Sequence, residues 1–218
     1  MLRGVLLGLL VPLALVAQSQ SVEIVLERNE SGAWKTIDPG LVLKPADLVR
    51  FRFHTSFDGY LYVINSGTSG AQSLLFPGEA TGRNNRVQAG KEYFVPSTGA
   101  SFKVAGPAGH DIVYWLVSPV PLEGNPAAAL GRSETARPAP KLVPRCDDSI
   151  FRARGLCIDS SAGPRNVPAE EALPSAISAV PNMTRRELVI VQDKDKARVS
   201  STGKLTGPVV YEFRLAHS

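Results

Sequence analysis

The stretch Leu48-Val-Arg-Phe-Arg-Phe-His54 decides the fold class of this chain, because its side chains alternate in kind. Phe51 and Phe53 fall on one side of an extended strand, and the three basic side chains fall on the other. A repeat of two residues indicates a strand with one buried face and one face in water. The stretch therefore predicts a strand whose one face packs on the core while the other faces solvent.

Further strands are expected on both sides of this one, separated by turn signals such as Asp58-Gly59, Pro77-Gly78 and Gly106-Pro107. Short strands with turn signals about every 8–12 residues are typical of a β-sandwich, immunoglobulin-like or related. The expected strands cover residues 22–27, 48–54, 60–64, 74–76, 93–95, 102–104 and 112–117.

The composition changes in residues 123–185, which contain 8 of the 17 prolines and no convincing strand pattern. A long proline-rich connection is usually a linker or a functional loop. The segment 168–173 begins like a helix, with a proline first and acidic residues in its first turn, and Pro174 would end it. We therefore expect a long, partly helical insertion.

Two strands are expected after the insertion, at residues 187–191 and 209–215. Two isolated strands are marginal in water, so they should return to the first sheet segment. The predicted organisation is a signal peptide at 1–19, a β-sandwich domain at 20–122, the insertion at 123–185, and C-terminal strands at 186–218 that complete the β domain.

Cys146 and Cys157 are the only cysteines. In an exported chain an even cysteine count favours a disulfide over a metal pair or free thiols. The pair brackets an expected short helix around residues 150–153, which an aspartate at 147 or 148 would cap and Gly155 would end.

The first residues predict export. Arg3 is the only charge before Glu23, and the run from Val5 to Ala17 is apolar apart from one glycine and one proline. This pattern is typical of a cleaved signal peptide, and an uncleaved anchor is the alternative. Removing residues 1–19 leaves 23 basic and 20 acidic side chains and no later segment able to span a membrane, which predicts a secreted or periplasmic protein. A net charge of +3 is no sign of nucleic-acid binding.

The sequence offers no pattern of catalytic, metal-ligating or cofactor-binding residues. His54, His110 and His217 are scattered along the chain, and no nucleophile signature such as Gly-x-Ser-x-Gly is present. The pair His110-Asp111 would make a triad with a serine only on paper, because serine is common. We therefore expect no catalytic residues, no metal and no cofactor.

The basic side of the opening strand is the one candidate binding feature, formed by Arg50, Arg52 and His54. Such a stripe could bind an anionic glycan, a membrane surface or an acidic partner. The alternative is a solvated sheet face, on which charge prevents aggregation.

Several short motifs are distinctive in their order and spacing, and their positions are Asp58, Gly59, Tyr60, Leu75, Phe76, Pro77, Gly90, Phe102, Gly106, Pro107 and Gly109. In this combination they resemble the bacterial domain-of-unknown-function family 4384. The resemblance covers about Val42 to Leu122, and it implies a small β-rich module that stands alone behind a signal peptide or is attached to caspase-like peptidases or serine/threonine kinases. It supplies no catalytic residues.

These observations predict an exported, non-catalytic β-rich module that binds a protein or envelope component, or acts as a scaffold, in the bacterial cell envelope. The alternative is a small secreted hydrolase or a peptidase-associated regulatory domain. An enzyme would bring a nucleophile, a base and an orienting group together in one pocket. A binding module would instead present an exposed apolar patch or an open strand edge.

Overall fold

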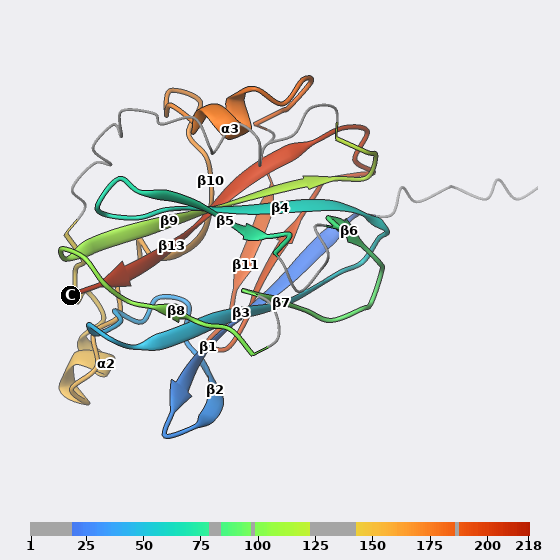
Figure 1. Cartoon of the computed structure of the whole chain (residues 1–218). Helices are drawn as coiled ribbons and strands as arrows, with labels where there is room; N and C mark the ends of the chain where they lie inside the picture. Colours follow the sequence, from blue (N-terminus) through green and yellow to red (C-terminus); the bar gives the residue numbers. More distant parts are fainter. Residues whose placement is uncertain (1–18, 79–83, 97–98, 123–142, 186–187) are drawn as a thin grey trace, which may run out of the picture.

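The computed structural model describes residues 19–78, 84–96, 99–122, 143–185 and 188–218. Its strands form two antiparallel sheets, which lie one above the other in Figure 1, with the short helix α3 above the upper sheet and the β2 hairpin below the lower one. The predicted signal peptide lies almost wholly outside the described residues, as does the first part of the insertion, at 123–142.

The lower layer is a seven-stranded sheet. Its order is β11-β12-β1-β3-β7, with β2 paired to β1 and β8 paired to β3. The strands are β1 (Ser21–Glu30), β2 (Ala33–Ile37), β3 (Leu48–Thr55), β7 (Tyr93–Val95), β8 (Phe102–Lys103), β11 (Val189–Gln192) and β12 (Ala197–Ser200).

The upper layer is a six-stranded sheet. Its order is β10-β13-β9-β4-β5, with β6 paired to β4. The strands are β4 (Gly59–Ser66), β5 (Gln72–Phe76), β6 (Arg86–Val87), β9 (Gly109–Ser118), β10 (Gly163–Asn166) and β13 (Val209–His217). Two short helices accompany the sheets, α2 (Ser149–Ala153) and α3 (Ser175–Ser178).

Aromatic side chains join the two sheets. Trp115 on β9 is fully buried, and its ring meets Phe51 and Phe53 on β3 edge-on, with centroid distances of 5.6 and 5.3 Å. On its own sheet, Trp115 stacks on Tyr211 at 6.1 Å. Buried aromatic side chains dominate the energetics of protein cores. These contacts therefore hold the two sheets face to face.

The alternation predicted for residues 48–54 is confirmed. Phe51 and Phe53 are buried to 1 % exposure or less, whereas His54 is exposed. The basic side chains lie on the outer face of the seven-stranded sheet, which is the side turned away from the core.

The C-terminal segment adds strands to both sheets. β12 pairs with β1, and β13 pairs with β9 in a register that places Tyr211 opposite Trp115. β12 was not expected, because the sequence Ala-Arg-Val-Ser is short and half polar. The segment thus supplies three strands where two were predicted.

The insertion differs from its prediction in two ways. The predicted helix at 168–173 is a turn, and α3 begins only after Pro174, whose ring fits the start of a helix better than its interior. β10 was also unexpected, because its sequence Gly-Pro-Arg-Asn favours a turn, yet it pairs with β13.

The α3 segment covers the outer face of the six-stranded sheet. Ile177 and Val180 from the α3 segment pack in one buried cluster with Ile64, Leu116 and Val210. β13 is consequently buried on both faces, and this accounts for its nearly continuous burial. Among the described residues, no helix has the length and apolar character needed to cross a bilayer.

Candidate functional site

Asp58 and Gly59 of the family motif have a structural role at the start of β4. Asp58 Oδ1 accepts a hydrogen bond from the amide of Ala89 at 2.8 Å, which ties the start of β4 to a neighbouring loop. A Cβ atom on Gly59 would lie 2.5 Å from the carbonyl oxygen of Ser118. The backbone φ of Gly59 is not positive, unlike that of Gly90 and Gly106, so the close approach of Ser118 is what requires a glycine here.

Most of the remaining motif residues pack in the core or line a cavity between the two sheets. Phe76 is buried against Phe53 at 5.8 Å, and Pro77 follows it through a cis peptide bond. Leu75 and Phe102 line a cavity between the two sheets. Tyr60 is half-buried, Pro107 is exposed, and Gly109 is buried at the start of β9.

The basic stripe has acidic partners within the chain. Glu27 on β1 accepts hydrogen bonds from Arg50 Nε at 2.7 Å and from Arg52 Nε at 2.8 Å, and its side chain is only 8 % exposed. Arg52 also pairs with Glu92 at 2.9 Å. Burial lowers the pKa of Arg52, but the hydrogen bonds to Glu92 and Glu27 outweigh it and leave the pKa above its ordinary value. Whether the stripe binds an anion stays a prediction.

Two aromatic rings enclose Arg50. Its guanidinium carbon lies 4.3 Å from the centroid of the Trp34 ring and 4.4 Å from that of Phe94. We call Trp34, Arg50 and Phe94 the arginine clamp. A guanidinium over an aromatic face is stabilised by about 0.5–2 kcal/mol, depending on its exposure. The clamp and Glu27 together fix the position of Arg50.

The outer face around the clamp mixes charge with exposed apolar side chains. Arg198 pairs with Glu23 at 2.8 Å, and His54 lies opposite Glu23 in the β1–β3 register. At the end of the sheet, Val189 and Val191 on β11 are 51 % and 60 % exposed. The face therefore offers both hydrogen-bonding and apolar contacts.

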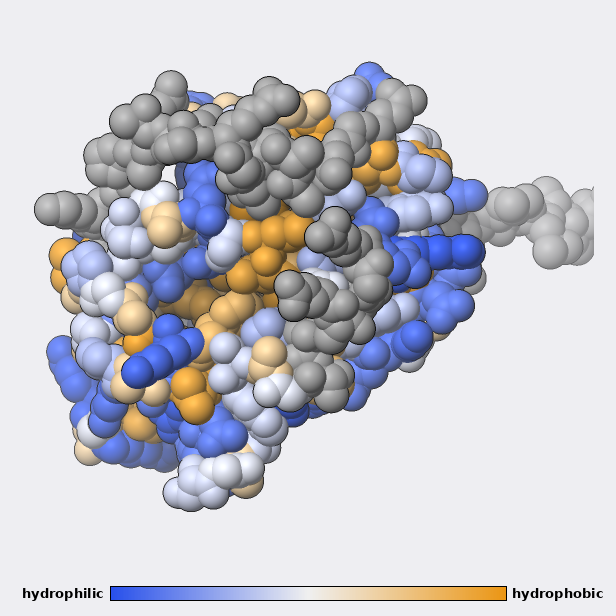
Figure 2. All heavy atoms as spheres, in the orientation of Figure 1, coloured by the Kyte–Doolittle hydropathy of each residue, from blue (hydrophilic) through white to orange (hydrophobic). Residues whose placement is uncertain are grey.

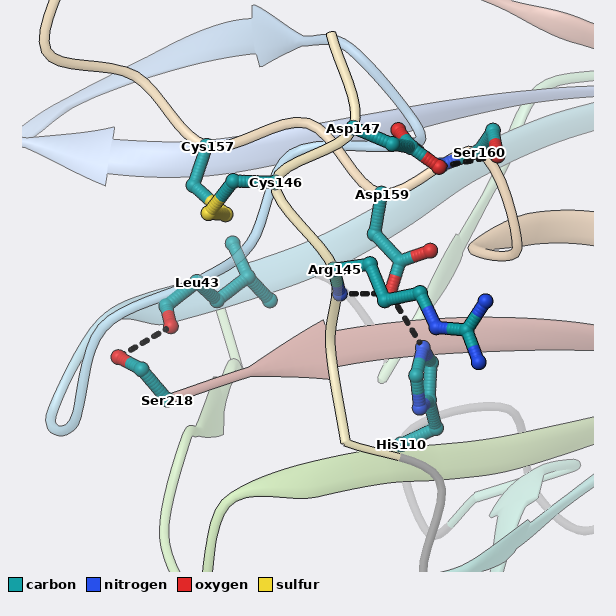
Figure 3. Close-up of a disulfide and its surroundings, with 9 residues drawn as sticks. All are labelled: Leu43, His110, Arg145, Cys146, Asp147, Cys157, Asp159, Ser160 and Ser218. Carbon is teal, nitrogen blue, oxygen red and sulfur yellow. Dashed lines mark hydrogen bonds and ion pairs between the residues drawn. A yellow bond between two sulfur atoms is a disulfide. The ribbon is translucent and has the colours of Figure 1, made fainter. Parts of the chain in front are cut away.

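The predicted disulfide is confirmed. Cys146 and Cys157 are bonded (Figure 3), with their Cα atoms 4.7 Å apart. In the sequence they enclose α2. The predicted cap of α2 is confirmed at Asp148, whose Oδ1 accepts the amide of Ile150, and Gly155 follows with a φ of +72°. We call residues 146–157 the disulfide loop. It is attached to the β domain by a hydrogen bond from the amide of Val42 to the carbonyl of Cys157.

A serine, a histidine and an aspartate meet beside the disulfide loop. His110 Nε2 lies 3.1 Å from Asp159 Oδ2 and 3.4 Å from Ser161 Oγ, while Ser161 Oγ donates to Asp159 Oδ1 at 2.6 Å. In a catalytic triad the serine and the carboxylate bond opposite nitrogens of the imidazole. Here both approach the same nitrogen, so the serine is not arranged to pass its proton to the histidine.

Asp159 has a structural environment. Its Oδ2 also accepts the amide of Arg145 at 2.9 Å (Figure 3). Burial raises the pKa of this carboxyl, but the hydrogen bonds from Ser161 and Arg145 and the nearby His110 bring it below its ordinary value. An ionised, buried carboxylate with this many donors organises the surrounding loop.

The three histidines lie in separate surroundings. His54 is exposed on the outer face, His110 meets Asp159, and His217 lies beside Asp111. Within the part of the chain that the structure describes, no three His, Cys, Asp or Glu side chains are grouped so that they could hold a metal ion.

Residues 42–121 match the model of a family described as Domain of unknown function (DUF4384). Over these residues the chain is similar to DUF4384 domains. The match covers β3 to β9 and all the motif positions that suggested it, whereas β1, β2 and the strands from β10 onward lie outside it. No curated protein and no solved structure matches the chain.

The partners of the basic stripe were not predicted from the sequence. Glu27, Trp34 and Phe94 come from three different strands, and the β1–β2, β1–β3 and β3–β7 registers together bring them to Arg50. Strand register depends on pairing over long sequence distances, so local patterns gave no signal for the clamp.

Proposed function

We propose that this protein is an exported, non-catalytic binding module of the cell envelope, and that the outer face of its seven-stranded sheet binds an acidic segment of a partner protein. The observation that carries the proposal is the arginine clamp. Tryptophan and arginine are the residues most enriched among those that dominate binding energy at protein interfaces. Here Trp34 and Arg50 are in contact on the outer face of the seven-stranded sheet, where the Arg50 side chain is 14 % exposed.

The charges around the clamp support an acidic partner. The stripe adds Arg52, whose side chain is 33 % exposed, and the exposed His54 to the clamped arginine. Glu27 on the neighbouring strand β1 pairs with the Nε atoms of both arginines and is itself nearly buried. A planar guanidinium held in this way is preorganised for bidentate binding of a carboxylate. Preorganisation lowers the entropy cost of binding.

The serine–histidine–aspartate cluster does not favour the hydrolase alternative. The side chains of His110 and Asp159 are 2 % and 1 % exposed, so a substrate has little access to them. Ser161 donates to the carboxylate instead of facing an activating base. The cluster is better suited to holding the loop between residues 143 and 163.

Affinity capture from the native cell envelope tests the proposal. The full chain and its Arg52→Glu variant are used as baits, and the bound proteins are quantified by mass spectrometry. We expect a partner with an acidic segment to bind the wild-type chain and to be depleted at least tenfold on the variant, because the reversed charge would face that segment. Increasing salt should weaken the same interaction.

Arg152→Glu is the matched control, since it makes the same charge reversal at an exposed site on α2, away from the stripe. Both variants must show the wild-type melting transition. Equal recovery of every partner by the two variants would contradict the proposal, as would a captured partner whose binding is indifferent to Arg52 and to salt.

A further inference from the structure

A second site lies between the two sheets. A cavity of about 130 Å³ is enclosed by apolar side chains such as Val49, Leu75 and Phe102, with Asn65, Lys103 and Asp111 also among its lining. Figure 2 shows apolar surface gathered in the hollow between the sheets on this face. Nine of its lining residues belong to the DUF4384 match, and β13 completes it with Leu215 and His217.

His217 is the unusual member of this lining. It is 1 % exposed, and neither of its ring nitrogens has a hydrogen-bond partner within the described part of the chain. The nearest charged group is Asp111, whose Oδ1 lies 3.5 Å from Nε2, outside hydrogen-bond geometry, and already accepts the amide of Thr68 at 2.8 Å. A buried polar group without a partner costs about 1–3 kcal/mol. A ligand that bonds the imidazole would recover this cost.

We propose that the cavity binds a small neutral molecule with an apolar ring or chain and one hydroxyl group. The apolar walls suit the body of the ligand, and the imidazole of His217 suits the hydroxyl, because each can both donate and accept a hydrogen bond. An apolar cavity of about 150 Å³ accepts benzene, so a single six-membered ring sets the size. Asp111 disfavours an anionic head group through like-charge repulsion.

The position of His217 is fixed from both sides. It pairs with Gly109 on β9, and Leu43 bridges to it from the segment before β3. Leu43 is itself held by hydrogen bonds to Ala216 and Ser218. The imidazole is therefore presented by a rigid frame, as a selective ligand site requires.

Titration with phenol, toluene and benzoate tests the site. The full chain with isotope-labelled histidine is followed by NMR. Phenol should shift the ring signals of His217, and it should bind about tenfold more tightly than toluene, which is the ratio expected for one buried hydrogen bond. Benzoate should bind most weakly. An absence of any shift at His217 with phenol at up to about 10 mM, a concentration that detects a site with a dissociation constant in the millimolar range, would overturn the proposal.

Two variants complete the test. His217→Phe should remove the preference for phenol over toluene. Val104 lines the cavity, and the larger side chain of Val104→Phe should occupy the cavity and abolish binding of both compounds. If His217→Phe does not fold, the wild-type ring signals and Val104→Phe decide the outcome. Equal preference for phenol in wild type and His217→Phe, or unaltered binding to Val104→Phe, would overturn the proposal. The cavity is separate from the outer face of the seven-stranded sheet, so these results test the ligand site independently of the proposed function.

Discussion

His110 Nε2 on β9 lies 3.1 Å from Asp159 Oδ2, and this contact joins the segment that matches DUF4384 to the segment that follows the disulfide loop. Both side chains are almost fully buried. A buried polar contact stabilises only when all its members are satisfied, so the pair makes the loop and the domain depend on each other.

Replacing Asp159 should destabilise the protein. Asp159→Ala leaves the amides of Arg145 and Ser161 and the imidazole of His110 without their acceptor. The expected loss is about 3 kcal/mol of unfolding free energy, measured by urea denaturation. Ser160→Ala, at the exposed neighbouring position, serves as the control and should cost about 1 kcal/mol or less. Equal effects of the two substitutions would show that the buried contact is unimportant.

Breaking the disulfide should loosen a defined part of the chain. The double variant Cys146→Ser, Cys157→Ser should lose about 3 kcal/mol on the chain-entropy estimate for a loop of this size. Hydrogen exchange should accelerate at the amide of Val42, which bonds Cys157, and at that of Asp159, which bonds Gly40. The amides of β9 should keep their protection. Uniform acceleration across both sheets would contradict a local role.

The buried carboxyl of Glu212 predicts the pH dependence of stability. Burial raises its pKa above 4.5, while Arg214 at 2.6 Å opposes the shift. The folded state therefore binds this proton more tightly than the unfolded state does. The contribution of Glu212 to stability is full below pH 4.5 and is lost as the pH rises through the folded pKa.

Glu212→Gln isolates this contribution. The variant should gain stability relative to wild type as the pH rises from 4 to 8, because the glutamine carries no charge to bury. Unfolding free energies of the two proteins across this pH range provide the measurement. A constant difference between them would show that Glu212 has the same pKa in the folded and unfolded states.

The strands after residue 186 should be required for folding. A fragment of residues 20–122 lacks Tyr211 and Phe213, so Trp115 and Phe51 lose aromatic neighbours at 6.1 and 5.0 Å, respectively. We expect the fragment to aggregate or to lack a cooperative melting transition, whereas residues 20–218 melt cooperatively. A fragment that unfolds with a sharp transition would refute the dependence.

The sequence predicted most of the fold where strand patterns are local. Phe51 and Phe53 alternate with basic residues, and the expected strands of the DUF4384 segment are present. β10 and β12 were missed because Gly-Pro-Arg-Asn and Ala-Arg-Val-Ser carry little strand propensity and are held by pairing with β13 and β1. Tertiary contacts decide such segments.

The candidate sites were less predictable for the same reason. Arg50, Arg52 and His54 stood out in the sequence, but their partner Glu27 lies 23 residues from Arg50 and Trp34 comes from another strand. His217 was noted only as a scattered histidine, and nothing in the sequence places it beside Asp111 or in a cavity. The disulfide was predictable because only two cysteines are present.

Site-specific photo-crosslinking in producing cells tests the proposed binding face most directly. A photoreactive residue replaces Thr36, which is exposed on β2 and lies opposite Glu27 in the register, and Ser178, exposed on α3, provides the control position. We predict a crosslink from position 36 to an acidic segment of another protein, abolished by Arg52→Glu, and none to that protein from position 178. No crosslink from position 36, or the same products from both positions, would contradict the account.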